Sequence, residues 1–245
     1  MYLALCDALR YIYTVDVQKK ERWLMFNTIA DTYDKANRWI TFGCDILWRK
    51  AVVAAIPNTA KTLLDIASGT MDVAIAAASQ HPNLSAITAM DMAQDMLHIG
   101  EQKCKQKNID IIQPLVADVH NIPLNTAAMD AITVSFGIRN FEHLDTAFTE
   151  MHRVLNTNGH LVILETCQPQ SKLLRYFNYL YLKCWVQWVG KTFTKDPSAY
   201  TYLMNTIKTF HSPSTLKQKL LNAGFQHVDI SFHMLQSVQI IHAHK

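Results

Sequence analysis

Residues 62–72 read Thr-Leu-Leu-Asp-Ile-Ala-Ser-Gly-Thr-Met-Asp. The apolar run at the start of this stretch predicts a buried strand over Thr62–Ile66, and a helical pattern follows over residues 73–79. Between them, Ala67, Ser68 and Gly69 are small enough for a ligand to approach the backbone closely. Backbone amides of the turn and of the helix start can then bind a carboxylate. The stretch therefore predicts a ligand-binding turn after the first strand of an open α/β sheet.

The same alternation of short apolar runs and helical patterns continues along the chain. We expect further strands at residues 86–90, 111–116, 131–135 and 161–164. Helical patterns at residues 93–107 and 144–155 lie between them, and each connection is long enough for a right-handed crossover. This order predicts a doubly wound, mostly parallel sheet.

Two regions depart from that alternation. Helical patterns at residues 23–32 and 45–56 precede the first strand, and an aromatic-rich segment covers residues 172–210. A tail then has a helix at 214–223, a stop at Gly224 and two strands, 225–232 and 236–242, close enough to pair as an antiparallel hairpin. We expect one seven-stranded domain over residues 19–245 with a helical lid at about 170–212, after an extension at 1–18. Ordinary core packing is the alternative for the aromatic segment.

Composition excludes several classes of protein. A chain of 245 residues suits one large α/β domain, and a net charge of +3 is too small to favour nucleic acid as a partner. The five cysteines are scattered without a CxxC pair, which argues against a disulfide framework or a structural zinc site and favours a reducing compartment.

Residue spacing also argues against a metal site and against membrane-spanning helices. Eleven histidines are present, but no HxxxH pair stands on an expected helix beside a carboxylate, so we expect no metal site. Charges interrupt the longest apolar stretches before 18 residues, so no transmembrane helix is expected, and residues 1–17 lack the basic start of a secretory signal.

Acidic residues stand at the ends of the next two expected strands. Asp91 follows the second strand, where a carboxylate can accept hydrogen bonds from both hydroxyls of a ribose. Asp118 and Val119 follow the third strand, where a carboxylate can accept from an adenine amino group and a backbone amide can donate to the ring. Dinucleotides and S-adenosylmethionine share these demands. NAD is disfavoured, because its G-x-G-x-x-G loop has three glycines and this loop has only Gly69.

Pieces of sequence spread from about residue 19 to the end match one known family. They are residues 25–34, 37, 42–43, 48–50, 64–70, 91–92, 96–97, 118, 122–123, 135–140, 153–155, 164–165, 200, 202–203 and 223–225. On these pieces the chain resembles the ubiquinone/menaquinone biosynthesis C-methyltransferases (UbiE/MenG). The run Phe-Gly-Ile-Arg-Asn at residues 136–140 is the most discriminating piece, because it looks like the family's own motif after the fourth strand.

The resemblance implies a Rossmann-like class I methyltransferase with S-adenosylmethionine as its cofactor. The implied cofactor contacts are Gly69, Thr70, Asp91, Asp118, Val119 and Ser135. It also places Arg139 and Asn140 beside the substrate, a prenylated quinol that receives a methyl group on a ring carbon. The sequence departs from the family at Met71, where glycine is usual and a positive φ would be costly. It also departs in the expected turn at residues 156–159, which reads Asn-Thr-Asn-Gly in place of the usual Lys-Pro-Gly-Gly, and at Gln236 and Gln239.

A ring carbon becomes a good nucleophile when its neighbouring hydroxyl loses a proton. We therefore expect Arg139 to stabilise the developing oxyanion by charge-assisted hydrogen bonding and Asn140 to orient it, with a water carrying the proton away. A surface ion pair is the alternative for Arg139. A cytoplasmic protein with transient contacts to the inner membrane face follows from a lipid-tailed substrate. Self-association and contacts with other quinone-synthesis proteins stay open.

Two other functions stay open at this point. One is a class I methyltransferase that acts on another small aromatic or lipid acceptor. The other is a non-catalytic scaffold in a quinone-synthesis assembly, which Met71 alone favours because it stands in the cofactor loop.

Overall fold

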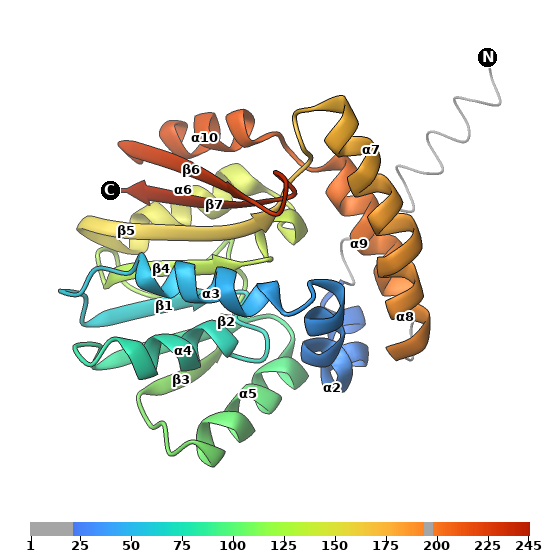
Figure 1. The fold of residues 1–245 in the computed structure, drawn as a ribbon. Coiled ribbons are helices and arrows are strands. Elements are labelled where there is room, and N and C mark those ends of the chain that lie inside the picture. Colours follow the sequence, from blue (N-terminus) through green and yellow to red (C-terminus); the bar gives the residue numbers. More distant parts are fainter. Residues whose placement is uncertain (1–21, 194–197) are drawn as a thin grey trace.

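The sheet has seven strands in the order β3-β2-β1-β4-β5-β7-β6 in a computed structural model that describes residues 22–193 and 198–245 (Figure 1). In chain order the strands are β1 (Thr62–Ile66), β2 (Ala86–Asp91), β3 (Ile112–Val116), β4 (Met129–Ser135), β5 (Leu155–Thr166), β6 (His227–His233) and β7 (Val238–His244). Strand β7 is antiparallel to both of its neighbours, and the other pairs are parallel. This topology confirms the doubly wound sheet and its antiparallel hairpin.

Some helices cover the two faces of the sheet, and others form a separate layer at the carboxyl ends of its parallel strands. They are α2 (Arg22–Ile40), α3 (Cys44–Ala54), α4 (Asp72–Gln80), α5 (Gln94–Gln106), the 3-10 helix η1 (Ile138–Asn140), α6 (Leu144–Val154), α7 (Lys172–Tyr181), the π-helical turn η2 (Leu182–Val186), α8 (Gln187–Phe193), α9 (Ser198–Thr209) and α10 (Pro213–Asn222). Helices α3, α4 and α5 share one apolar core with the sheet, and α6 and α10 share a second core on its other face. Because strand side chains alternate between faces, Leu63 belongs to the first of these cores and Leu64 to the second.

A separate helical layer stands at the carboxyl ends of the parallel strands. Helices α2, α7, α8 and α9 form this layer, which lies at the right of Figure 1. Its apolar core joins α2, η2, α8 and α9 and is distinct from the two cores of the sheet. The aromatic segment contributes to both core and surface, since Tyr200 and Tyr202 are buried whereas Tyr176, Phe177 and Trp188 are exposed. We call these helices the lid, and the expected extension at 1–18 lies outside the described residues.

Several element boundaries differ from the sequence expectation. Helix α2 continues to Ile40 instead of ending at residue 32, because Ala36 and Ile40 extend its buried face. Strand β5 begins at Leu155, and its register against β4 steps from Met129↔Leu155 to Ala131↔His160, so the expected turn at 156–159 is a bulge within the strand. Strands β6 and β7 each begin two residues later than expected.

The structure also bears on the membrane spans, cysteines and histidines that the sequence analysis considered. No helix among residues 22–193 and 198–245 is long and apolar enough to cross a membrane. Cysteines 44, 104, 167 and 184 are free thiols. The sheet gathers His160, His242 and His244, which are scattered in the sequence, because β5 and β7 are neighbours.

Candidate active site

A cavity opens at the carboxyl ends of β1 and β4, where the strand order reverses. Ligands bind at this position in open α/β sheets. The cavity has an empty volume of about 740 Å³, counted out to open solvent, and its walls are the loops after β1, β2, β3 and β4 together with helix α2. We call it the first cavity.

Five of the predicted cofactor contacts line this cavity: Gly69, Asp91, Asp118, Val119 and Ser135. Thr70 does not line it, since its Oγ1 donates a hydrogen bond of 2.7 Å to Oδ1 of Asp34 on α2 and the residue is 2% exposed. Asn140 lines the first cavity, whereas Arg139 lines a neighbouring one. The structure therefore separates the two predicted catalytic residues, although they are adjacent in the sequence.

The carboxylate of Asp91 is held rigidly at the end of β2. One of its oxygens accepts the amide hydrogen of Gly69 and the other accepts that of Ala93, each at 2.8 Å. Burial raises the pKa of Asp91 above its usual value, although these amides oppose that shift. Each oxygen keeps a lone pair after accepting one amide, so the carboxylate can accept two further hydrogen bonds, as a ribose diol requires.

A histidine absent from the sequence prediction lies beside Asp118. Nδ1 of His120 lies 2.5 Å from Oδ1 of Asp118, and its Nε2 accepts the amide hydrogen of His143 at 3.1 Å. Because Nε2 is an acceptor, the proton of the neutral ring is on Nδ1. Both ring nitrogens are engaged, so His120 forms part of the cavity wall and is not placed to act as a base. A single histidine after a strand carries no signal that would have identified it.

The loop after β4 offers the first cavity an unused polar atom. The Oγ of Ser135 is buried and has no hydrogen-bond partner among the described residues. Such a group costs about 1–3 kcal/mol unless a ligand satisfies it. Gly137 keeps this loop against the loop of β1, since a Cβ at residue 137 would lie 2.6 Å from the Cβ of Ala67. The donors, acceptors and shape fit an adenosine-containing cofactor.

A buried carboxyl supports the floor of the same loop. Asp65 accepts hydrogen bonds of 2.6 Å from Oγ of Ser68 and from Oγ1 of Thr133, which join β1, its loop and β4. Burial raises the pKa of Asp65 to about 6, although both hydroxyls lower it. The ionised form at neutral pH is therefore costly to the fold.

A second cavity adjoins the first. It has an empty volume of about 680 Å³, and Phe26, Tyr33 and Phe136 line both cavities. Its other walls come mainly from the apolar side chains of α2 and α9. We call it the second cavity; the charged residues that line it are Arg139 and Asp45, and Asp45 is paired with Arg38.

Arg139 forms a buried ion pair, so the alternative of a surface ion pair is wrong. Its Nη1 lies 2.8 Å from Oε1 of Glu165, and its side chain is only 7% exposed. Burial lowers the pKa of Arg139, but the charge of Glu165 outweighs that effect and the net pKa is raised. Nη1 also donates to the carbonyl oxygen of Phe136, whereas the buried Nε has no partner among the described residues. A cation with an unused donor therefore lies at the wall of an apolar cavity.

Glu165 and Tyr202 hold the two predicted catalytic residues. Glu165 is fully buried at the end of β5 and also accepts the amide hydrogen of Arg139 at 3.2 Å. The hydroxyl of Tyr202, on α9, donates to Oδ1 of Asn140 at 3.1 Å. A carboxylate at the end of an apolar strand was a usable signal for Glu165, but nothing in the sequence connects residue 202 with residue 140.

Charged side chains connect α2 to the cofactor loop. Nζ of Lys103 on α5 lies 2.5 Å from Asp34 and 2.8 Å from Asp72 at the start of α4. Arg38 on α2 lies 2.8 Å from the same Asp72 and also pairs with the buried Asp45 of α3. Since Thr70 donates to Asp34, the loop itself joins this network.

Comparisons with known proteins agree with this geometry. The sequence profile of the ubiE/COQ5 methyltransferase family matches residues 15–245. The chain belongs to the ubiE/COQ5 methyltransferase family. It is 39% identical over 210 residues to a demethylmenaquinone methyltransferase of Thermotoga maritima, covering 85% of this chain and 89% of the relative. It is 36% identical over 214 residues to the ubiquinone/menaquinone biosynthesis C-methyltransferase UbiE of Geotalea daltonii, covering 84% and 90%.

Solved structures agree at the level of the fold. A SAM-dependent methyltransferase from Aquifex aeolicus superposes with a TM-score of 0.61 at 14% identity, covering 89% of this chain and 97% of that one. Together with family membership, the fold makes this chain an S-adenosylmethionine-dependent methyltransferase of the ubiE/COQ5 family.

Proposed function

We propose that this ubiE/COQ5 family member transfers the methyl group of S-adenosylmethionine to a ring carbon of a prenylated quinol of the demethylmenaquinol type. The observation that carries the proposal is the buried guanidinium of Arg139 at the wall of an apolar cavity next to the first cavity. The relatives named demethylmenaquinone methyltransferase support menaquinone over ubiquinone chemistry.

The first cavity is the proposed cofactor site. When bound, S-adenosylmethionine supplies a methyl group on a positively charged sulfur. Asp91 would accept from the ribose hydroxyls, while Asp118 and the amide of Val119 would bind the adenine. Gly69 and Ser135 would contact the remainder of the molecule. Thr70 would act through Asp34, because its side chain points to α2.

The second cavity is the proposed quinol site. Loss of the hydroxyl proton places negative charge on the quinol oxygen and on the neighbouring ring carbon. The guanidinium of Arg139 would donate to that oxygen, and its charge would favour the ionised quinol. Glu165 is a positioning residue, because it fixes Nη1 and so directs the remaining donor.

The ring carbon then forms a bond to the methyl carbon as the methyl–sulfur bond breaks, and the ring regains aromaticity by losing its own proton. Asn140, held by Tyr202 at the first cavity, would orient the ring. Arg139 stays protonated and His120 is engaged at both nitrogens, so a water is the proposed proton acceptor.

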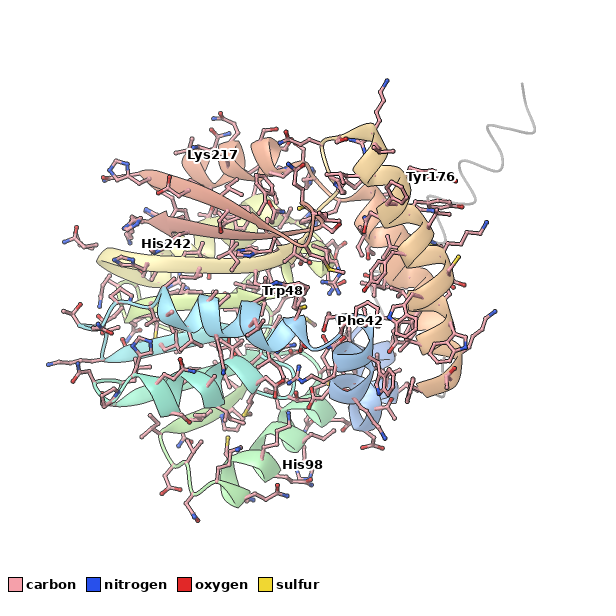
Figure 2. All side chains as sticks on the ribbon, viewed as in Figure 1. Phe42, Trp48, His98, Tyr176, Lys217 and His242 are labelled. Atoms are coloured by element: carbon pink, nitrogen blue, oxygen red, sulfur yellow. The ribbon has the colours of Figure 1, made fainter. Side chains whose placement is uncertain are left out.

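The lid is the proposed membrane contact. The exposed apolar side chains of this layer and of the adjoining turn include Phe42, Leu173, Tyr176, Phe177 and Trp188, and Figure 2 shows Phe42 and Tyr176 on the same side of the molecule. Residues 172–193 and 198–209 contain five basic residues and no acidic one. Aromatic and basic side chains together suit an anionic lipid surface. The location proposed is the cytoplasmic side of the membrane that holds the quinol.

Sedimentation with phosphatidylglycerol vesicles tests this contact. A Tyr176→Ser/Phe177→Ser/Trp188→Ser variant should lose at least tenfold in vesicle affinity, while methylating a short-tailed quinol at the wild-type rate. Replacing the exposed His98 on α5 with serine is the matched surface control. Equal vesicle binding by all three proteins would contradict the proposed surface.

The decisive experiment for the activity is methylation of reduced demethylmenaquinol with labelled S-adenosylmethionine. We expect one methyl group on the ring, located by mass spectrometry and NMR, and slower transfer to a methoxybenzoquinol with the same tail. Calorimetry with the cofactor runs in parallel. Cofactor binding without transfer to either quinol would support another acceptor, and no cofactor binding would support the scaffold alternative.

A further inference from the structure

A cluster of histidines lies outside both cavities. His160 on β5 and His242 and His244 on β7 place one ligand nitrogen each within 4.8 Å of one another. Nδ1 of His160 is 2.9 Å from Nε2 of His242, and the ring centroids of His160 and His244 are 4.3 Å apart. All three residues are partly buried, so their rings are accessible from solvent yet held by the sheet.

The sheet geometry explains why these rings converge. His160 pairs directly with His244 in the antiparallel register of β5 and β7, and His242 lies two residues from His244. Because side chains two residues apart in a strand share a face, all three imidazoles stand on the same face of the sheet. The site is therefore fixed by backbone hydrogen bonds rather than by mobile loops.

We propose that His160, His242 and His244 form a binding site for a late first-row divalent cation, with Zn²⁺ as its expected occupant. Imidazole nitrogens bind Zn²⁺ at about 2.0–2.1 Å, which places neighbouring ligands about 3.4 Å apart in a tetrahedron. The nitrogens here lie within 4.8 Å of one another, with one pair at 2.9 Å, and rotation of the rings about their side-chain bonds would bring them to that spacing.

The surroundings offer a fourth ligand. Strand β6 pairs with the outer edge of β7, and its register sets His227 opposite His244 and Asp229 opposite His242. Directly opposed residues share a face, so both side chains stand beside the cluster, and both are exposed.

The cation would be structural rather than catalytic. Thr166, at the carboxyl end of β5, lines the second cavity, and the six residues from there to His160 span about 20 Å of strand. Figure 2 shows His242 at the end of the sheet away from Tyr176 and the lid. A bound ion would join β5 to β7 across 82 residues of sequence and hold the C-terminal hairpin on the sheet.

The test uses the full chain without an affinity tag, with Zn²⁺ alone as the probe. Titration against a chromophoric chelator should give one equivalent bound, with an affinity at least tenfold tighter than that of His242→Gln and of His244→Gln. His98→Gln is the matched control, because His98 is an exposed histidine on α5 whose side chain is 65% exposed. Its affinity for Zn²⁺ should equal that of the wild type.

Two further measurements keep the result interpretable if a variant loses stability. Co²⁺ should give the intense visible bands of a four-coordinate site in the wild type and weak bands in the variants. Zn²⁺ at a hundredfold excess over its Kd should raise the Tm of the wild type by roughly 5–11 °C. Equal Zn²⁺ affinity in the wild type and both cluster variants, or a six-coordinate Co²⁺ spectrum, would overturn the proposal and indicate an adventitious ion only.

Discussion

Met71 and Gly100 face each other beneath the loop after β1. Met71 has φ 62° and ψ 24°, the left-handed conformation that favours glycine, and its side chain is fully buried. A Cβ added to Gly100 on α5 would lie 2.4 Å from Cγ and 2.7 Å from Sδ of Met71. The methionine that departs from the family pattern therefore occupies space that the absent side chain of Gly100 leaves open. The perturbation we consider is a double-mutant cycle of Met71→Gly and Gly100→Ala.

The two single changes should each destabilise the protein. Met71→Gly removes about 1–2 kcal/mol of left-handed strain but loses a buried methionine, whose truncation costs about 2–5 kcal/mol. Gly100→Ala in the wild type overpacks the contact with Met71 and costs about 1–3 kcal/mol. In the Met71→Gly background the same alanine has space and gains about 0.5–1 kcal/mol of helix stability. The sites should therefore couple by about 1.5–4 kcal/mol.

Urea unfolding of the four proteins, followed by circular dichroism, measures this coupling. Calorimetry should show less than a threefold change in cofactor affinity, because the side chain of Met71 is not part of the first cavity wall. The reasoning fails if Met71→Gly is more stable than the wild type. It also fails if Gly100→Ala has the same effect in both backgrounds.

Four further changes, at three residues, address the site itself. Burial raises the pKa of Asp65 to about 6, so the folded state binds its proton more tightly than the unfolded chain does, and stability falls as the pH rises from about 4 to about 6. Relative to the wild type, Asp65→Asn should therefore gain about 3 kcal/mol in unfolding free energy between pH 4 and pH 7, and parallel pH profiles would contradict this. Arg139→Lys keeps a charge beside Glu165 but removes Nε, so kcat should fall by roughly 10–100-fold with cofactor affinity intact. Arg139→Ala should also destabilise the fold by about 3–5 kcal/mol because Glu165 is left unpaired, and unchanged activity in either variant would refute the oxyanion role. Asp91→Asn should weaken cofactor binding by about 10–100-fold in calorimetry, since charged acceptors contribute about 1.5–3 kcal/mol, and wild-type affinity would exclude Asp91 as a ribose ligand.

The sheet could be predicted because its strands are short apolar runs whose spacing permits only crossover connections. Strand β1 matches its predicted bounds, and the acidic residues at the strand ends meet at one edge because parallel strands share that edge. Local sequence therefore sufficed to place Asp91 and Asp118 at the cavity wall, whereas Ser135 was expected there only from the family resemblance. Thr70 was expected to contact the cofactor, but it does not line the first cavity. Its hydroxyl donates instead to Asp34, which lies 36 residues earlier in the chain.

The rest of the site depends on partners that no local pattern connects. Glu165 meets Arg139 across 26 residues and Tyr202 meets Asn140 across 62. The aromatic segment was ambiguous for a physical reason, since a helix that buries Tyr200 and a helix that exposes Tyr176 have similar composition. Three dispersed histidines became neighbours only through the register of β5 and β7.

The separate apolar core of the lid has a consequence for how a water-insoluble molecule enters. Helix α2 joins that core through Ile29, Ala36 and Ile40, and it meets the cofactor loop through charged and hydroxyl groups. A small apolar cluster also joins α2 to the start of α5, where Ala30 packs with Ala93 and Met96. A layer with its own apolar core can tilt away while both halves stay folded, and the surfaces that separate would be these charged contacts and this small cluster. Such a tilt would admit an apolar substrate while exposing only a small apolar surface of the protein. The entrance would then be the part of the molecule most sensitive to ionic strength, and the sheet the part least sensitive to it.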